Sequence, residues 1–252
     1  MSDRYLPAVL QRTDAHTRVF CLPHAGAGAS AYRTWSNELL PGLQLCAVQL
    51  PGRENRLGEP PIDSAAALVR ELVSGLHPFL DRPFVVFGHS MGALLAFELA
   101  CELRRAGLPQ PARLFLAAHK APHLPFDQPP VHQLNPREFR AELRRLEGTP
   151  ETVLANEELM QIAEPILRAD FRLCETYVYE PVEPLDVPFS VFGGENDPKV
   201  SAAALEPWRA HTRVSMSVRA LPGGHLFLQS ARAQLVSAML SDLHMESFRL
   251  TI

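Results

Sequence analysis

One serine between two glycines is the residue of this chain best suited to covalent chemistry. Ser90 is the centre of the pentapeptide Gly88-His89-Ser90-Met91-Gly92, which follows an apolar run at 84–87 and precedes a helical pattern at 91–106. A G-x-S-x-G sequence between a strand and a helix is typical of a nucleophile elbow, a turn so sharp that it exposes the serine hydroxyl at the rim of a sheet. We therefore predict that Ser90 is a nucleophile. The alternative is an ordinary glycine-rich turn.

A serine hydroxyl is a weak nucleophile at neutral pH, so it needs a nearby base, and that base needs an orienting acid. His225 ends the sequence Leu221-Pro222-Gly223-Gly224-His225, directly after a predicted strand. We predict His225 as the base and Asp197, on the loop after the preceding predicted strand, as the acid. Glu195 is the nearest alternative for the acid. Asp186 precedes that strand and so falls at the opposite end of the sheet.

Backbone amides are the expected stabilisers of the negative charge that develops when a serine attacks a carbonyl group. Met91 follows the nucleophile and supplies one such N–H. The loop at 22–30, rich in glycine and alanine, follows the first predicted strand and can supply a second N–H. Ala25 is the predicted donor, with His24 and Gly26 as neighbouring alternatives. The glycines also permit a phosphate-binding loop, but no Lys-Ser/Thr pair follows them.

These residues must be positioned by alternating strands and helices. Short apolar runs predict strands at 19–22, 43–48, 84–87, 114–117, 189–192 and 215–218. Helical patterns alternate with them at 64–80, 91–106, 201–211 and 226–243. This alternation predicts an α/β fold with a mostly parallel central sheet and helices on both faces. The candidate side chains all follow strands, so they share the carboxyl edge of that sheet.

The region 122–184 contains no predicted strand. It holds an amphipathic helical pattern at 136–146 and a second one from 156 to about 179, in which Pro165 marks a kink or a start. An insertion between parallel strands lies over their carboxyl ends, where ligands bind. We interpret it as a lid inserted into a single domain that spans residues 1–252. A helical subdomain that only extends the core is the alternative.

Nine further histidines are weaker candidates for the base. His89 is expected to pack beside the elbow. Surface positions are expected for four of them: His16, His77, His211 and His244. Three others lie close to the predicted lid and could line a substrate channel, although solvated loop positions are the simpler interpretation: His119, His123 and His132.

Length and composition set limits on the class of protein. The 252 residues suffice for one large α/β domain, and a net charge of −4 argues against nonspecific nucleic-acid binding. No apolar run approaches the roughly 18 residues that a membrane span needs, and the N-terminus lacks the shape of a signal peptide. The four cysteines are widely spaced, without a metal-ligand pattern. We therefore expect free thiols, no bound metal, no membrane contact and a cytoplasmic protein.

Five segments in this order give the chain a strong resemblance to a known family. They are Leu22-Pro23-His24-Ala25-Gly26-Ala27-Gly28, Gln49-Leu50-Pro51-Gly52-Arg53-Glu54, Gly88-His89-Ser90-Met91-Gly92, Gly193-Gly194-Glu195-Asn196-Asp197-Pro198 and Leu221-Pro222-Gly223-Gly224-His225. Together they resemble the type II thioesterases that accompany modular polyketide and nonribosomal peptide synthases. Residues Asp170 to Tyr177 also resemble the lid helix of that family. The segment at 49–54 has no chemical role that its sequence reveals.

The resemblance implies an α/β-hydrolase fold, a Ser90–His225–Asp197 triad and an oxyanion hole formed by the amides of Ala25 and Met91. It also implies hydrolysis of acyl groups from the phosphopantetheine arm of acyl or peptidyl carrier proteins, which clears aberrant or stalled units. No cofactor of the enzyme itself is implied, and we expect a monomer.

Other functions are compatible with the same residues. A carboxylesterase or an acyltransferase could use the same triad, and a catalytically inactive fold could serve as a binding module, although no triad member is missing. Carrier proteins of such synthases are commonly acidic, so a basic patch would help them to dock. Four arginines of the predicted lid could form it, or could simply be a solvated helix face: Arg137, Arg140, Arg144 and Arg145.

Overall fold

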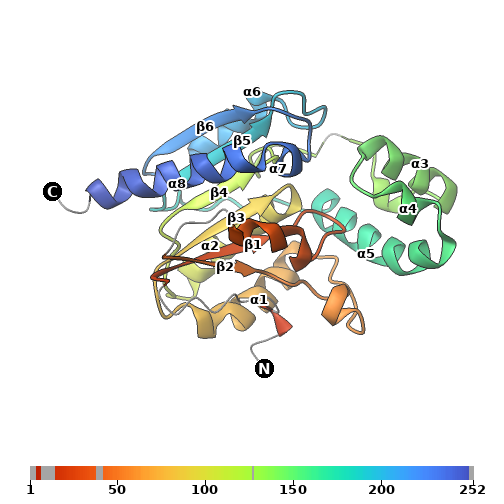
Figure 1. Cartoon of the computed structure of the whole chain (residues 1–252), viewed down its shortest axis with the longest axis horizontal. Coiled ribbons are helices and arrows are strands. Elements are labelled where there is room, and N and C mark those ends of the chain that lie inside the picture. Colours follow the sequence, from red (N-terminus) through yellow and green to blue (C-terminus); the bar gives the residue numbers. More distant parts are fainter. Residues whose placement is uncertain (1–3, 7–14, 38–41, 127, 250–252) are drawn as a thin grey trace.

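A six-stranded parallel sheet forms the centre of the protein (Figure 1). The computed structural model describes residues 4–6, 15–37, 42–126 and 128–249. The sheet has the order β2-β1-β3-β4-β5-β6. Its strands are β1 (Thr17–Leu22), β2 (Leu43–Ala47), β3 (Phe84–His89), β4 (Leu114–Ala117), β5 (Phe189–Gly194) and β6 (Met216–Leu221). All six predicted strands are present, and the predicted α/β fold class is confirmed.

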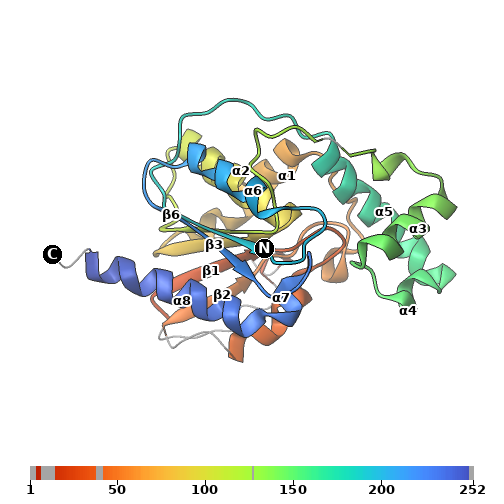
Figure 2. The same ribbon diagram turned by 90° about the horizontal axis from the view of Figure 1, so that it is seen from above.

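Helices cover both faces of the sheet, and Figures 1 and 2 show the two layers from perpendicular directions. Side chains alternate along β1, so that Phe20 and Leu22 pack into one core and Val19 and Cys21 into the other. The first core contains α1 (Ala65–Leu76), α2 (Met91–Arg105), α6 (Ala202–Leu205) and η6 (Glu206–His211). The second contains η2 (Ala29–Asn37), α7 (Phe227–Ser230) and α8 (Arg232–Arg249).

Several elements end at other positions than the sequence predicts. The α-helix predicted at 64–80 stops at Leu76 and continues as the short η4 (His77–Phe79), which contains Pro78. The helix predicted at 201–211 is divided into α6 and η6, with Pro207 at the start of η6. Proline lacks the N–H that an α-helix would need at these points, which explains both breaks. The helix predicted at 226–243 is likewise divided, into α7 and α8.

The chain between β4 and β5 contains most of the remaining helices. They are η5 (Val131–Gln133), α3 (Pro136–Leu146), α4 (Glu151–Leu154) and α5 (Glu157–Glu175). Pro165 lies inside α5 and does not begin it. These helices share a small core of their own, formed by Phe139, Leu143, Leu154, Met160 and Leu167. We call residues 122–184 the lid. The bounds of the lid and the assignment of the whole chain to a single domain stay predictions.

The strand order creates a crevice next to β1. Because β1 lies between β2 and β3, the chain leaves β1 toward one side of the sheet and later returns to the other side. Ligands of open α/β sheets bind at such a switch point, outside the carboxyl ends of the strands. Leu22 and Gly88 are paired there, so the loop after β1 lies beside the elbow after β3.

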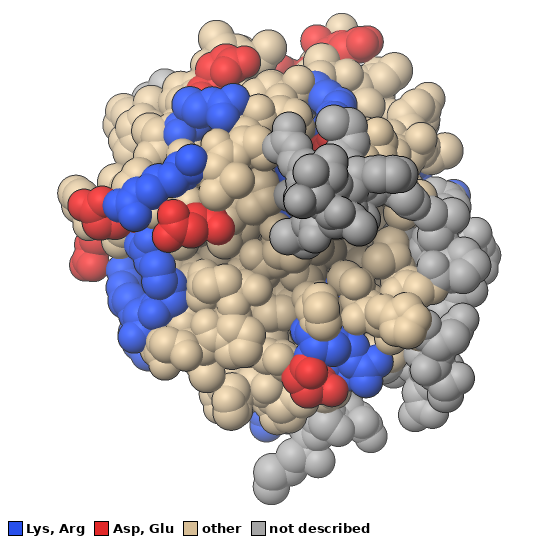
Figure 3. All heavy atoms as spheres, turned by 90° about the vertical axis from the view of Figure 1, so that its left-hand side faces the viewer, with Lys and Arg blue, Asp and Glu red and all other residues tan. Residues whose placement is uncertain are grey.

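The opposite end of the molecule differs from the lid end. Figure 3 shows that Lys and Arg side chains there lie among Asp and Glu side chains, so they do not form one continuous basic surface.

Within the described ranges, no helix is both long enough and apolar enough to cross a membrane. All four cysteines carry free thiols: Cys21, Cys46, Cys101 and Cys174.

Candidate active site

The turn between β3 and α2 has the strained geometry of a nucleophile elbow. Ser90 has φ 54° and ψ −118°, a backbone conformation that residues other than glycine rarely adopt. A Cβ atom on Gly88 would lie 2.0 Å from the carbonyl oxygen of Gly92. One on Gly92 would lie 2.1 Å from the carbonyl oxygen of Leu22. Both glycines are therefore required, because they let the turn close against itself and against β1.

The three predicted triad side chains meet at the carboxyl edge of the sheet. The Nε2 atom of His225 lies 2.9 Å from the Oγ atom of Ser90. Its Nδ1 atom lies 2.8 Å from the Oδ2 atom of Asp197. The three residues come from the ends of β3, β5 and β6, so the parallel sheet brings together positions far apart in the sequence. This arrangement is a continuous hydrogen-bonded chain from carboxylate to hydroxyl.

Asp197, and not Glu195, reaches the imidazole. The Asp197 carboxylate is fully buried, and its Oδ1 atom accepts hydrogen bonds from the amides of Lys199 at 2.8 Å and Val200 at 3.2 Å. Burial opposes its ionisation, but the bonds from His225 and from these amides outweigh burial and hold the pKa of Asp197 below its usual value. Glu195 is exposed. Asp186 lies 4.0 Å from Arg213 in an exposed pair.

The predicted oxyanion donors line one cavity with the nucleophile. The amide of Gly26 donates to the Oδ2 atom of Asp170 at 2.7 Å, so this alternative donor is occupied. Across the described residues, the backbone amides of Ala25 and Met91 have no hydrogen-bond acceptor. Both residues line the larger cavity next to Ser90, whereas His24 lines only a smaller one. The geometry therefore favours Ala25 over its neighbours.

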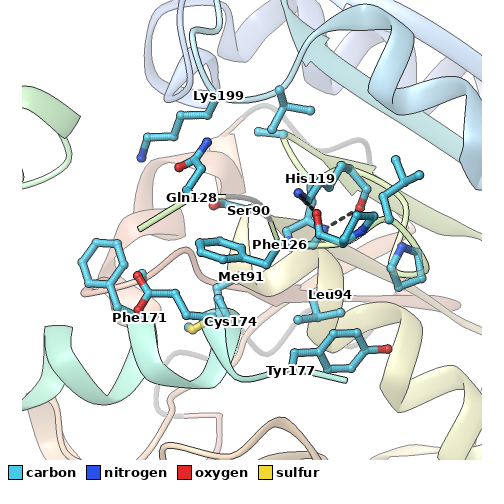
Figure 4. A pocket seen from close by; sticks show the side chains of 18 of the residues that line it. Ser90, Met91, Leu94, His119, Phe126, Gln128, Phe171, Cys174, Tyr177 and Lys199 are labelled. Atoms are coloured by element: carbon cyan, nitrogen blue, oxygen red, sulfur yellow. Dashed lines mark hydrogen bonds between the residues drawn. The ribbon is translucent and has the colours of Figure 1, made fainter. Parts of the chain in front are cut away.

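The larger cavity has a volume of about 410 Å³ and opens beside Ser90 (Figure 4). Its wall is formed by Met91 and Leu94 of α2, by Phe171 and Cys174 of α5, and by the loop after β4. A smaller cavity of about 60 Å³ lies under α3 and shares Ser90 and His225 with it. The apolar lining suits an acyl chain, and the position of Ser90 suits attack on its carbonyl carbon.

Lys199 borders both cavities with a partly buried ammonium group. Burial lowers its pKa, and the Asp197 carboxylate partly offsets that effect. His24 also lines the smaller cavity, and burial lowers its pKa to about 4. The imidazole of His24 is therefore neutral at pH 7, so Lys199 is the cation that faces this part of the site.

Two of the remaining histidines are buried in the structure. His89 is buried and packs beside the elbow as predicted, with its Nε2 atom 2.8 Å from the carbonyl oxygen of His225. His211 is buried against Phe97 and Trp208, so its predicted surface position is wrong. The side chain of His244 lies outside the described residues.

The other candidates divide between the surface and the lid entrance. His16 and His77 are exposed as predicted. His119 and His123 line the larger cavity, and His132 contacts the Glu175 carboxylate of α5.

The predicted basic patch on α3 is largely neutralised by acids of the lid. Arg140 pairs with Glu157 at 2.7 Å, and Arg144 pairs with Glu151 at 3.0 Å. Arg145 pairs with Glu142 on its own helix. The sequence left a docking patch and a solvated helix face as alternatives for these arginines and did not reveal their acidic partners. It also gave no role to Arg53, which the structure buries in a bidentate ion pair with Asp170.

Comparison with known proteins identifies relatives of this chain. The gramicidin S biosynthesis protein GrsT of Aneurinibacillus migulanus is 41% identical over 231 residues, which are 92% of this chain and 90% of GrsT. The RedJ thioesterase from the prodiginine biosynthetic pathway of Streptomyces coelicolor superposes with a TM-score of 0.84 at 38% identity, and the match covers 90% of this chain and 85% of RedJ.

A third protein extends the match to nearly the full chain. The type II thioesterase BorB from the borrelidin biosynthetic cluster superposes with a TM-score of 0.85 at 35% identity, over 96% of this chain and 98% of BorB. The thioesterase domain family matches residues 17–244. The resemblance to type II thioesterases and the α/β-hydrolase fold that it implies are thereby confirmed. The chain belongs to the thioesterase domain family.

Proposed function

We propose that this thioesterase hydrolyses acyl groups from the phosphopantetheine thiol of acyl or peptidyl carrier proteins, and so clears aberrant or stalled units from a modular polyketide or nonribosomal peptide synthase. The observation that carries the proposal is the hydrogen-bonded chain Asp197–His225–Ser90, which ends at an apolar cavity. The membership of relatives such as RedJ and BorB in biosynthetic pathways supports the choice of substrate.

Ser90, His225 and Asp197 are the proposed catalytic residues. His225 accepts the proton of the Ser90 hydroxyl while the oxygen attacks the thioester carbonyl carbon. The amides of Ala25 and Met91 stabilise the resulting oxyanion. The carbon–sulfur bond then breaks, and the proton on His225 passes to the departing pantetheine thiolate. Asp197 holds the imidazole in the tautomer that presents Nε2 to the serine.

The second half of the reaction returns the enzyme to its starting state. Water gives a proton to His225 and adds to the acyl-serine carbonyl carbon, again through an oxyanion at Ala25 and Met91. The ester bond breaks, the carboxylic acid leaves, and the proton on His225 returns to the Ser90 oxygen. These steps use groups of the chain, the substrate and water, so we propose no cofactor. The phosphopantetheine belongs to the partner protein.

The physical state of the enzyme is part of the same proposal. We propose a cytoplasmic monomer that binds neither nucleic acid nor membrane, and the net charge of −4 supports the expectation for nucleic acid. A carboxylesterase or acyltransferase with the same triad is not favoured, because RedJ and BorB are named as thioesterases.

The test is the substitution Ser90→Ala in the full chain, assayed on carrier proteins loaded with different acyl groups. Intact-protein mass follows loss of the acyl group and appearance of the free thiol. We expect turnover to fall by on the order of 10,000-fold or more, because the nucleophile is lost while the fold remains. Labelling by a fluorophosphonate should disappear as well.

The matched control is Ser74→Ala, which removes an exposed serine of α1 and should leave both readouts unchanged. Turnover that persists in Ser90→Ala would remove Ser90 from the mechanism. Faster turnover of p-nitrophenyl esters than of every carrier-bound thioester would favour the carboxylesterase, and transfer of the acyl group to an added alcohol would favour the acyltransferase.

A further inference from the structure

The segment from Gln49 to Glu54, to which the sequence assigns no role, holds the loop after β1 through its polar side chains. It leads into the short η3 (Glu54–Arg56). Gln49 is fully buried, and its Oε1 atom accepts a hydrogen bond from the amide of Ala29 at 2.9 Å. Glu54 accepts a hydrogen bond from the Ser30 hydroxyl at 2.6 Å. One side of the loop at 23–30, which we call the oxyanion loop, is thus held by this segment.

Asp170 of the lid helix α5 holds the other side of the oxyanion loop. Its carboxylate is completely buried and accepts two hydrogen bonds from Arg53. The Nη1 atom of Arg53 donates to Oδ2 at 2.6 Å, and the Nη2 atom donates to Oδ1 at 2.8 Å. Its Oδ2 atom also accepts the amide hydrogen of Gly26 at 2.7 Å. Arg53 in turn donates to the carbonyl oxygen of Ala27 at 3.2 Å. The ion pair therefore binds two neighbouring residues of the loop directly.

These contacts fix the residue immediately after the proposed oxyanion donor. Gly26 has φ 78°, and a Cβ atom there would lie 2.5 Å from Leu167 of α5. The side chain of Leu167 thus packs closely against the loop at Gly26, and the Asp170 carboxylate accepts the hydrogen bond from the Gly26 amide. The rigid peptide unit that carries the Gly26 N–H also contains the Cα atom of Ala25. Holding this unit therefore fixes the position of the Ala25 Cα atom, to which the proposed donor N–H is attached.

We propose that Asp170 and Arg53 are positioning residues that hold the Ala25 amide toward Ser90, so that the seating of lid helix α5 completes the oxyanion hole. This inference rests on the proposed function, in which Ala25 supplies one of the two donors. It assigns a catalytic consequence to a lid residue that does not line either cavity. The Arg53–Asp170 pair then acts on the transition state and leaves substrate binding untouched.

The test is Asp170→Asn in the full chain. Asparagine keeps the size of the side chain but is neutral and has one acceptor oxygen. It therefore loses the bidentate ion pair, and its NH2 group must face either the guanidinium of Arg53 or the amide of Gly26. We expect kcat per active site to fall about 100-fold, the usual effect of losing one oxyanion donor, while KM changes less than about 3-fold. Active sites are counted by stoichiometric fluorophosphonate labelling, which corrects for any unfolded fraction.

Two further readouts separate positioning from a purely structural role. An alkyl boronic acid forms a tetrahedral adduct with a serine hydroxyl and places an oxygen in the oxyanion position, so it should bind Asp170→Asn much more weakly than the wild type. Arg53→Lys keeps the positive charge but loses the bidentate geometry, and we expect an intermediate kcat. This milder variant keeps the proposal testable even where Asp170→Asn folds poorly.

Asp63→Asn is the matched control. Asp63 also pairs with an arginine of α5, Arg172 at 2.8 Å, but this pair is exposed and does not touch the oxyanion loop. We expect its kcat to equal that of the wild type. Equal losses in Asp63→Asn and Asp170→Asn, or a change confined to KM, would overturn the inference. An unchanged kcat in Asp170→Asn together with an inactive Ser90→Ala would overturn it and leave the proposed function intact.

Discussion

The lid is attached to the rest of the protein in two different ways. The C-terminal half of α5 belongs to the body, because Leu173 is fully buried in the main core and Asp170 is paired with Arg53 in the interior. Helices α3 and α4 instead pack into the separate small core of the lid. Their ion pairs, such as Arg144 with Glu151, are exposed to solvent and join one part of the lid to another.

The two kinds of attachment indicate that α5 is the fixed part of the lid and that α3 and α4 are its mobile part. A buried ion pair that loses one partner leaves an uncompensated charge, so α5 is strongly bound in its place. Exposed pairs contribute at most about 1 kcal/mol and are screened by salt. We therefore expect α3 and α4 to open without α5, which would admit a substrate while the oxyanion loop keeps its shape.

The largest expected effect comes from removing a leucine of the main core. Leu173→Ala should lower the free energy of global unfolding by about 3 kcal/mol, because a fully buried leucine leaves a cavity when it is truncated. The same truncation in the small lid core, Leu154→Ala, should mainly lower the free energy of local opening. Urea denaturation measures the first quantity, and native-state hydrogen exchange of the α3 and α4 amides measures the second.

The comparison depends on these two truncations behaving differently. Fast exchange in α3 and α4 of the Leu154→Ala variant, with an unchanged main unfolding transition, would support two separate units. Should both variants shift the main transition equally, with no faster exchange in α3 and α4, the lid and the body form one cooperative unit.

Acid should weaken the body before it weakens α3 and α4. Burial lowers the pKa values of His24 and His211 to about 4, whereas the segment at 136–154 contains no histidine. The unfolded chain binds protons at these imidazoles near pH 6.5 and the folded chain does not, so the free energy of unfolding falls as the pH drops from 6.5 to 4. For His24 the loss between pH 7 and pH 5 is about 2 kcal/mol.

Urea denaturation at pH 7 and at pH 5 measures this loss. His24→Gln should remove the share of the pH dependence that His24 contributes, about 2 kcal/mol, because glutamine does not titrate. The share of the other buried imidazoles, such as His211, should stay. His77→Gln is the control, since His77 is exposed at the end of α1. Identical pH dependence in the wild type and in His24→Gln would show that His24 binds its proton equally in both states.

Buried strands were the easiest part of this fold to predict. Strands β3 and β4 are buried along their whole length, and a parallel strand covered on both faces appears as an unbroken apolar run. The edge strand β6 was predicted at 215–218 and extends to Leu221, because its partly exposed residues, Arg219 among them, do not form such a run. Pairing with β5, which ends at Gly194 opposite Leu221, determines its true end.

In the active site, the residues that could be predicted from the sequence are those marked by a local turn motif or by their order along the chain. The elbow has a local motif, and the loops after β5 and β6 supplied Asp197 and His225 in the order typical of the fold. Arg53 and Asp170 are 117 residues apart, and neither has a local pattern that indicates a buried partner. His211 was expected at the surface because its neighbours in sequence are polar, yet the fold places it between aromatic rings.

The smallest expected effect concerns the exposed arginines of α3. Arg144→Glu combined with Arg145→Glu replaces two exposed ion pairs by like charges, which should change stability little because solvent screens exposed charges. Because Glu151 and Glu142 already neutralise these arginines, we expect only about a 3-fold rise in KM for a carrier-bound substrate at low salt, and less at high salt. KM for a small acyl-pantetheine should not change. A similar rise for both substrates would mean that the change acts on the cavity through α3, and that these arginines do not dock the carrier protein.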